Sequence, residues 1–474
     1  MPGATTIIWF RRDLRLHDNP ALLEAVRASD GDVAALFVID HVFVAPSGPA
    51  RTRYLHQTLD ALNDSIDGAL IVRRGEPSEE LARLARELDV RQVFATGDFG
   101  PRGRHRDEHV RNELARLGLS VNYVDSPYVV APGIVTTKTG TPCRVFGAFQ
   151  RGWHEHATTG TLPAPSGVRW RRARSVSLGE LDEDSGQRRP SFFPDVADDL
   201  PPHLAPAGEQ AGLRLLKGFD DLVDDYEEAR NLPGRDATSR LSPFLRYGAL
   251  HPRQVLSALD GTSTGRATFR SEVCWREFYA DVMYRQPNSA WQSLQPAMRQ
   301  LRWDTGALAE ERFALWANGQ TGFPLVDAGM RQLLSEGWMH NRVRMITASF
   351  LVKHLHVDWR WGAKWFMWHL IDGDLASNQH GWQWVAGTGT DPSPFHRIFN
   401  PTLQATRFDP QGTYVHRYVP ELRSVPAPQC LEPGGGTGML RASDYPFAMI
   451  DAALERDEAL SRFHDARERA RVAS

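Results

Sequence analysis

The stretch Leu370-Ile-Asp-Gly-Asp-Leu-Ala-Ser-Asn-Gln-His-Gly-Trp-Gln-Trp384 gathers polar and aromatic side chains in an apolar setting. An ionised carboxylate is costly to bury unless it is paired or hydrogen-bonded, so Asp372 and Asp374 require cationic or donor partners. Asn378 adds an amide that both donates and accepts hydrogen bonds. The two tryptophans that close the stretch can stack on a flat heterocycle or fill a core. Together these residues favour a bound aromatic cofactor over a helix end with an Asp-Gly turn.

Length, charge and cysteine content limit the class of protein. The chain has 474 residues, more than one hydrophobic core usually organises, so we expect two domains. Cys143, Cys274 and Cys430 fit neither a disulfide framework nor a CxxC metal site, and we expect a cytoplasmic protein. A net charge of -3 means that any binding of nucleic acid requires arginines gathered on one face. We find no signal segment and no apolar run of bilayer length, and expect no membrane association.

The first third of the chain alternates between two hydrophobic periods. Short apolar runs predict buried strands at 6–10, 33–39, 69–72, 92–95 and 121–124. Amphipathic stretches predict helices at 21–29, 54–66, 78–88 and 106–117. This alternation is typical of an α/β fold with a doubly wound parallel sheet, which binds ligands beyond the carboxyl ends of its strands.

The loop after the first predicted strand argues against a nicotinamide-type dinucleotide site. Arg11-Arg-Asp-Leu-Arg15 stands where a glycine-rich phosphate loop would be expected. Gly434-Gly-Gly-Thr-Gly438 follows no predicted strand, and we interpret it as a surface loop. The segment 163–206 is rich in Pro, Ser, Asp and Arg and is interpreted as an interdomain connection. Within it, Arg169-Trp-Arg-Arg-Ala-Arg174 is interpreted as a solvated basic segment, with contact to a phosphate backbone as the alternative.

After Leu213 the pattern becomes helical almost to the end of the chain. The strongest helical segments are 269–284, 324–336, 340–357 and 361–371. We therefore predict an α/β domain at 1–135, a linker at 136–210 and an all-α domain at 211–474. The histidine pairs 154/156 and 354/356 do not place two imidazoles on one helical face, so we expect no metal site.

Three further motifs accompany the opening stretch. They are Trp9-Phe-Arg-Arg-Asp-Leu-Arg-Leu-His-Asp-Asn-Pro20, Trp338-Met-His-Asn-Arg-Val-Arg-Met345 and Arg397-Ile-Phe-Asn-Pro401. Together they resemble the photolyase/cryptochrome family, above all its class I cyclobutane pyrimidine dimer photolyases, over nearly the whole chain. The resemblance implies an antenna-chromophore domain at 1–135 and a helical domain at 211–474 that binds FAD and DNA. The implied activity is a light-dependent lyase that splits cyclobutane pyrimidine dimers by electron transfer from photoexcited reduced FAD, acting as a monomer on UV-damaged DNA.

The segment Thr238-Ser-Arg-Leu-Ser242 places hydroxyls and a guanidinium at a predicted helix start. Free N–H groups and the helix dipole suit a phosphate there, although an ordinary helix cap is the alternative. The resemblance assigns the segment to the pyrophosphate of FAD, and it places Asn378 at flavin N5. Arg344 is a candidate partner of Asp372. The FAD contacts that the resemblance implies are Tyr226, Thr238, Ser239, Arg240, Leu241, Ser242, Arg276, Asp372, Gly373, Asp374 and Asn378.

One face of the predicted helix at 269–284 carries Glu272, Trp275 and Arg276 at spacings of three and four. In an isolated helix these residues would be interpreted as a surface ion pair beside a core tryptophan. The resemblance implies that Glu272 hydrogen-bonds the damaged bases, while Trp275 and Trp384 stack on them. The DNA and lesion contacts that it implies are Arg230, Glu272, Trp275, Asn341, Arg342, Met345, Trp384 and Arg397.

Tryptophan is abundant, with 14 residues in the chain. The resemblance implies that Trp382, Trp359 and Trp303 relay an electron to the excited flavin, which would make them part of the catalytic set with Glu272 and Asn378. The stretch around Trp303 departs in length from the family pattern. The other tryptophans are expected to pack helices.

An antenna chromophore is expected in the amino-terminal domain by the same resemblance. The folate type resembles a pattern with a glutamate shortly before an Arg-Asp pair, and Gly103 stands at that position. A glycine offers no side chain to a pterin and lets a flat tricyclic ring approach the backbone. We therefore expect 8-hydroxy-5-deazaflavin rather than methenyltetrahydrofolate, with an empty cleft as the alternative. The candidate contacts are Arg11, Arg51, Asp98 and Arg104.

Two other functions compete with dimer repair. A cryptochrome-type photoreceptor would share fold and flavin, but the chain retains the residues Glu272, Trp275 and Trp384 that the resemblance assigns to a lesion. A (6-4) photoproduct lyase is also less favoured, because that subfamily places a histidine pair where this chain has Asn341 and Arg342.

Overall fold

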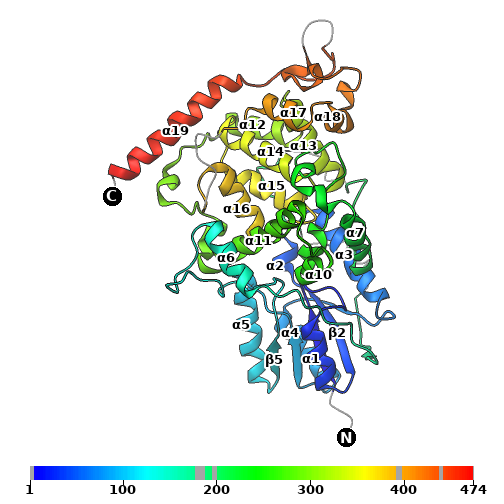
Figure 1. Ribbon diagram of the computed structural model, residues 1–474. Coiled ribbons are helices and arrows are strands. Elements are labelled where there is room, and N and C mark those ends of the chain that lie inside the picture. The colour runs from blue at the N-terminus through cyan, green and yellow to red at the C-terminus, as the bar shows by residue number, and fades with distance from the viewer. Residues whose placement is uncertain (1–4, 177–186, 195–199, 391–397, 437–440, 473–474) are drawn as a thin grey trace. The chain divides into compact units, whose positions relative to one another are not determined.

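The computed structural model describes residues 5–176, 187–194, 200–390, 398–436 and 441–472 (Figure 1). Packing divides the chain into two compact units. Unit 1 comprises Met1–Arg188, Ala205–Asp224 and Ser239–Pro287, and unit 2 comprises Arg189–Leu204, Asp225–Thr238 and Asn288–Ser474. The ranges predicted from sequence are continuous, whereas each unit is assembled from three segments of chain. The boundaries of the predicted domains therefore stay a prediction.

Unit 1 contains a parallel sheet with the strand order β3-β2-β1-β4-β5. Its strands are β1 (Thr6–Phe10), β2 (Asp32–Ile39), β3 (Ile71–Arg74), β4 (Gln92–Ala95) and β5 (Ser120–Tyr123). Strands β1 and β2 are wholly buried, which explains their continuous apolar sequences. They pair in register from Thr6 opposite Val33 to Phe10 opposite Phe37. The order of strands changes direction at β1, so the predicted doubly wound α/β class is confirmed.

The helices that follow these strands are α1 (Pro20–Ala28), α2 (His41–Val44), α3 (Pro49–Asp64), α4 (Pro77–Glu87) and α5 (Pro101–Arg116). Four of these five helices overlap the predicted ranges, although α3 and α5 begin five residues earlier than predicted, and the short α2 was not predicted. Leu84 of α4 and Leu114 of α5 belong to the same buried cluster as Ile7 of β1. Unit 1 also contains α6 (Phe146–His156), α7 (Glu209–Asp220), α9 (Ser242–Tyr247), α10 (Pro252–Ala258) and α11 (Thr264–Arg285).

The basic segment 169–174 begins with a strand that the sequence did not predict, while its four arginines are exposed, as its interpretation as a solvated segment expects. Arg169–Arg171 is β6 and pairs in parallel with the first residues of β2. Arg171 donates two hydrogen bonds of 2.6 Å to Asp32, and these lower the pKa of the Asp32 carboxyl. A strand of three residues is too short for a period of two to be recognised in the sequence.

A buried carboxylate fastens α11 within unit 1. Glu277 accepts hydrogen bonds from the backbone N–H groups of Val129 and Val130, at 2.6 and 3.0 Å, and from Trp153 Nε1 at 2.6 Å. Burial raises the pKa of Glu277, and the three donors oppose that rise. Glu277 therefore joins α11 to α6 and to the segment that follows the sheet.

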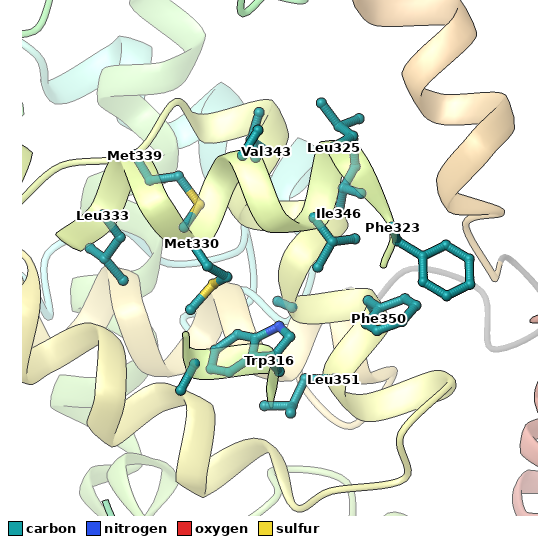
Figure 2. Close-up of a cluster of buried hydrophobic side chains, with 14 of the residues drawn as sticks. Trp316, Phe323, Leu325, Met330, Leu333, Met339, Val343, Ile346, Phe350 and Leu351 are labelled. Carbon is teal, nitrogen blue, oxygen red and sulfur yellow. The ribbon is translucent and has the colours of Figure 1, made fainter. Parts of the chain in front are cut away.

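Unit 2 is helical throughout its described part. Its α-helices are α8 (Tyr226–Ala229), α12 (Ala307–Ala317), α13 (Pro324–Glu336), α14 (Asn341–Lys353), α15 (Trp359–His369), α16 (Leu375–Ala386), α17 (Pro401–Phe408), α18 (Thr413–Tyr418) and α19 (Ala452–Val472). Figure 2 shows part of its core, in which Trp316, Met330 and Ile346 belong to one buried cluster. Trp316 Nε1 donates to the backbone oxygen of Thr347 at 3.0 Å, so its polar atom is satisfied. None of the helices in the described ranges is long and apolar enough to cross a bilayer.

Helix α14 ends four residues before the predicted end at 357, since its last residue is Lys353. His356 has a φ of 53°, in the left-handed region that ends a right-handed helix. Leu355 and Val357 are nevertheless buried in the core of unit 2. The apolar pattern of the sequence therefore extends to 357 because the turn that follows α14 is buried as well.

We expect Trp153→Phe to lower the free energy of unfolding by about 1–2 kcal/mol, because Glu277 loses one of three donors while it stays buried. Denaturant unfolding measures the effect. Trp291→Phe is the control, because Trp291 is 44% exposed and its replacement should cost less than about 0.5 kcal/mol. Equal losses in the two variants would contradict the role given to Glu277.

Candidate functional site

Asp372 forms the ion pair that the sequence suggested. Arg344 on α14 donates to both carboxylate oxygens, at 3.2 Å from Nη1 and 2.8 Å from Nη2. The side chain of Asp372 is 2% exposed and that of Arg344 is 23% exposed, so the pair is largely shielded from water. Arg344 Nε also donates to the backbone oxygen of Met339 at 2.7 Å. The expected partnership is confirmed, and it fixes the loop before α16 to α14.

Asp374 and Asn378 occupy the first turn of α16. Asp374 is the N-cap residue and accepts from the backbone N–H of Ser377 at 3.1 Å. Asn378 Nδ2 donates to the backbone oxygen of Ala363 at 3.0 Å and to Gln379 Oε1 at 2.8 Å. No residue in the described ranges donates to the side-chain oxygen Oδ1 of Asn378. The amide is thus held in one orientation with an acceptor left for a ligand.

Two of the three proposed relay tryptophans are buried in unit 2. Trp382 on α16 is 3% exposed, and its ring packs edge-on against Trp316 and Phe366 at centroid distances of 6.1 and 5.0 Å. Its Nε1 is buried without a hydrogen-bond partner among the described residues. Trp359, the first residue of α15, is 1% exposed and donates from Nε1 to Ser293 Oγ at 3.4 Å. These indoles have environments of low polarity.

Close packing of α15 against α16 depends on a glycine. A Cβ added at Gly362 would lie 2.1 Å from Cη2 of Trp382.

Trp303 lies in a smaller cluster with Leu301 and Phe463 and is half-buried. The order of electron transfer among the three tryptophans stays a prediction.

The first two turns of α14 hold three residues expected at the lesion. Asn341 is exposed, while Arg342 and Met345 are half-buried. The guanidinium of Arg342 lies 4.7 Å from the ring centroid of Phe408 and donates to Asn231 Oδ1. Asn231 was missed from sequence, because no motif connects it with Arg342. The arginine is held in place before any DNA is bound.

The other expected DNA contacts of unit 2 are dispersed along the chain. Arg230 lies over the ring of Tyr226, with its guanidinium 5.5 Å from the centroid. Trp384 is half-buried at the end of α16. Arg397 lies outside the described residues.

In unit 1, α11 brings Glu272, Trp275 and Arg276 together on consecutive turns, all of them half-buried. Arg276 donates to the backbone oxygens of Pro127 and Leu245, at 3.2 and 3.1 Å. Leu245 belongs to α9, so Arg276 joins the helix expected at the lesion to the helix expected at the pyrophosphate.

The segment expected at the pyrophosphate leads into α9. Leu241 is the N-cap of α9 and makes no side-chain cap, while its own N–H donates to Ser239 Oγ at 3.4 Å. Arg240 has a φ of 49°, so the chain turns sharply immediately before the helix. The helix begins at Ser242, as predicted. Thr238 is the last residue of the preceding segment, which belongs to unit 2.

A stacked aromatic partner of Trp275 was missed from sequence. The ring of Phe146, the first residue of α6, lies 3.7 Å from that of Trp275 with an interplanar angle of 7°. An isolated phenylalanine between polar residues carries no recognisable signal. The contact depends on the packing of α6 against α11.

The antenna candidates Arg11 and Asp98 lie near the carboxyl edge of the sheet, where both are engaged in ion pairs. Arg11 pairs with Asp107 and lies over the ring of Trp9, 4.4 Å from its centroid. Asp98 pairs with Arg106 at 3.2 Å, and Arg106 pairs with Asp107 at 2.8 Å. These charges satisfy one another within unit 1.

The surroundings of Gly103 bear on the expected approach of a flat ring to its backbone. Gly103 is buried in the first turn of α5, and a Cβ there would lie 2.2 Å from Cγ of Asp98. The carboxyl of Asp98 thus fills the place of a side chain at Gly103, so packing by itself explains this glycine, and the choice of antenna stays a prediction. Arg51 is buried in α3, whereas the exposed Arg104 lies 4.3 Å from the ring centroid of Tyr284.

Within the described ranges, no group of three or more histidine, cysteine or acidic side chains is arranged to hold a metal ion. Cys143, Cys274 and Cys430 are buried and free. Burial raises the pKa of the Cys274 thiol, so this side chain is protonated and is a poor nucleophile or metal ligand.

The chain matches two family models. The model described as DNA photolyase matches residues 6–166, and the model described as the FAD binding domain of DNA photolyase matches residues 269–465. A deoxyribodipyrimidine photo-lyase of Streptomyces griseus is 39% identical over 98% of this chain and 99% of its own length. One of Vibrio cholerae is 36% identical over 97% and 99%, respectively.

Solved structures of two kinds share the fold. A class III photolyase of Agrobacterium tumefaciens superposes with a TM-score of 0.87 at 34% identity, covering 99% of this chain and 98% of its own. A cryptochrome of Synechocystis sp. PCC6803 superposes with a TM-score of 0.84 at 28% identity, covering 97% and 99%. The fold by itself therefore does not separate repair from signalling.

We expect Arg344→Ala to destabilise the protein by about 3 kcal/mol, because it leaves the buried Asp372 carboxylate without its guanidinium. Adding Asp372→Asn should recover part of this loss, since the uncompensated charge is removed. Denaturant unfolding of the two single variants and the double variant measures the coupling. Strictly additive losses would contradict the pairing.

Proposed function

The chain belongs to the DNA photolyase family, and from this membership we propose that it is a light-dependent DNA repair lyase that splits cyclobutane pyrimidine dimers. The observation that carries the proposal is near full-length identity of 34–39% to relatives named deoxyribodipyrimidine photo-lyase. When bound, FAD would supply light-driven donation of one electron to the dimer. The electron returns after the cyclobutane ring has opened. The protein binds, orients and shields the reacting groups.

We propose that Asp372, Gly373, Asp374 and Asn378 of unit 2 contact FAD. The orientation of Asn378 supports this, because both hydrogens of its amide are already donated and its carbonyl oxygen is left for a ligand donor. A reduced flavin carries an N–H at N5, which fits that acceptor. An aspartate at this position would place a negative charge there, which disfavours an anionic reduced ring.

The remaining proposed FAD contacts are Tyr226, Arg276 and the segment Thr238–Ser242. The start of α9 supports a role in binding phosphate, because the N-cap residue Leu241 makes no side-chain cap hydrogen bond and a helix N-terminus favours an anion. Arg276 has already committed two donors to backbone oxygens. We infer that it shapes this segment while its positive charge attracts the pyrophosphate.

For the lesion, we propose that Glu272 hydrogen-bonds the damaged bases while Trp275 and Trp384 stack on them. Photolyases are among the enzymes that take a base out of the duplex. Stacking on an aromatic side chain contributes about 1–3 kcal/mol per base. Asn341 and Met345 of unit 2 are proposed as further contacts of the lesion.

We propose that the arginines 230, 342 and 397 contact phosphates. Of these, Arg342 is supported by its fixed position against Phe408. The partner is then UV-damaged DNA, bound by a monomer. The three buried, free cysteines support a reducing cytoplasm as its location.

The relay Trp382, Trp359 and Trp303 is proposed to return the flavin to its reduced state in light. Burial of the first two supports it, since a buried indole is shielded from competing reactions with solvent.

A cryptochrome-type photoreceptor is the second candidate function, favoured by the similarity to the Synechocystis cryptochrome.

We propose 8-hydroxy-5-deazaflavin as the antenna, ahead of methenyltetrahydrofolate. The remaining support is that Gly103 provides no side chain to hydrogen-bond a pterin. Arg11, Arg51, Asp98 and Arg104 stay as candidate contacts, with the first three largely buried.

We expect the illuminated, reduced protein to repair oligonucleotides that carry a cyclobutane dimer and to leave those with a (6-4) photoproduct unchanged. Chromatography of the products after blue or near-ultraviolet illumination measures both, with a dark sample as control. Repair of neither lesion would favour the photoreceptor, and repair of the (6-4) lesion would contradict the subclass.

The variant Trp382→Phe tests the proposed tryptophan relay separately from repair. Light-driven reduction of the oxidised protein should be largely lost, because phenylalanine is harder to oxidise than tryptophan, while chemically reduced protein should still repair. Survival of photoreduction in this variant would mean that the electron enters by another route.

The antenna is tested by expression in a host that produces deazaflavin. We expect an absorption band in addition to that of FAD, and the same protein from a host without deazaflavin is the control. A flavin-only spectrum, or retained folate, would contradict the choice drawn from Gly103.

A further inference from the structure

We propose that Phe146 is a positioning residue that holds the indole of Trp275 in the orientation needed to stack on a damaged base. The proposal rests on the function proposed above, in which Trp275 contacts the lesion. It adds a residue from α6, outside the motifs that identify the family. Phe146 itself does not touch the substrate.

The geometry between the two rings is face-to-face. Their centroids are 3.7 Å apart and their planes differ by 7°, so one face of the indole is covered by the phenyl ring. Both side chains are half-buried. Tyr279 adds a tilted contact with the indole at 5.4 Å and 49°. A stacked neighbour on one face restricts rotation of the indole, and we infer that a damaged base stacks on the opposite face.

Phe146 is itself held by a second aromatic contact. Its ring meets Phe278 at 5.9 Å and 65°, and Phe278 meets Trp275 at 5.7 Å and 71°. Phe278 is 0% exposed and makes an edge contact with each of the two rings. Phe146 could leave Trp275 only by giving up its edge contact with Phe278. This contact favours a permanent role of Phe146 as a support for Trp275. The alternative is that the Phe146 ring occupies the position of a base and is displaced when DNA binds.

Helix α6 is also fixed to α11 by a polar contact. Trp153, two turns after Phe146, donates from Nε1 to the buried carboxylate of Glu277 at 2.6 Å. Phe149 packs on Phe278 at 5.3 Å. The position of the Phe146 ring is therefore set by the same helix pairing that fixes Trp275. Preorganisation of this kind reduces the rotational freedom that must be lost when a base binds.

The test compares Kd for a duplex containing one cyclobutane dimer with Kd for the same undamaged duplex, in the dark. Phe146→Ala should lower this preference by roughly twofold to tenfold, the range expected for one aromatic pair. Phe146→Tyr keeps the ring and should retain the preference, whereas Phe146→Leu keeps bulk without stacking and should lose it. Affinity for undamaged DNA and FAD content should stay unchanged in all three.

A matched control is Phe99→Ala, which removes a half-buried phenyl ring from the same unit. Phe99 contacts Tyr128 and Tyr284 and makes no ring contact with Trp275, so the preference for the dimer should not change. In the Trp275→Ala background, Phe146→Ala should have no further effect, because the ring that it positions is gone.

The outcomes separate the two proposals. An unchanged preference in Phe146→Ala and Phe146→Leu would overturn the positioning role, and a raised preference would show that Phe146 blocks the stacking face. If Phe146→Ala fails to fold, the leucine and tyrosine variants decide the question. A wild-type protein without preference for the dimer would instead contradict the proposed function.

Discussion

The buried carboxylate of Glu277 is the interaction on which the arrangement of unit 1 depends. It accepts from the N–H groups of Val129 and Val130 and from the indole of Trp153, so three donors from two segments converge on one side chain of α11. Removing one donor from a buried acid costs more than an average hydrogen bond contributes, because the acceptor stays buried. One turn further along α11, Asp281 accepts from Gly133 N at 2.7 Å. One side of α11 is thus fixed, which leaves the side with Glu272 and Trp275 to present functional groups.

In unit 2, too, some residues fix the backbone while a neighbouring residue is left to contact a ligand. The pair between Arg344 and Asp372 fixes the loop before α16, and Asp374 caps that helix. Asn378 follows one turn later, with both hydrogens of its amide already donated. Each of these bonds removes a degree of freedom from the amide before any ligand is present. A polar group held in this way contributes to binding without the cost of ordering it.

Several residues that are expected to contact an antenna chromophore also have a part in the packing of unit 1. Gly103 is a glycine because the carboxyl of Asp98 occupies the place of a side chain. Asp98 and Arg11 are engaged with Arg106 and Asp107, which form one compact network of charges. Because buried charges are costly unless paired, such a network stabilises the sheet edge even if no antenna is bound.

The sequence by itself determined the class of both parts of the chain and the chemistry of the motifs. The strands β1 and β4 and the helix α13 match their predicted ranges, because hydrophobic period and turn residues are local properties. The partnership of Arg344 with Asp372 was also foreseen, since a buried acid in an apolar stretch demands a cation. Only the tertiary structure decided that Arg169–Arg171 is a strand, that α14 ends at Lys353 and that Phe146 supports Trp275. The physical reason is that these features depend on contacts between distant segments, as between Val129 and Glu277, which are 148 residues apart.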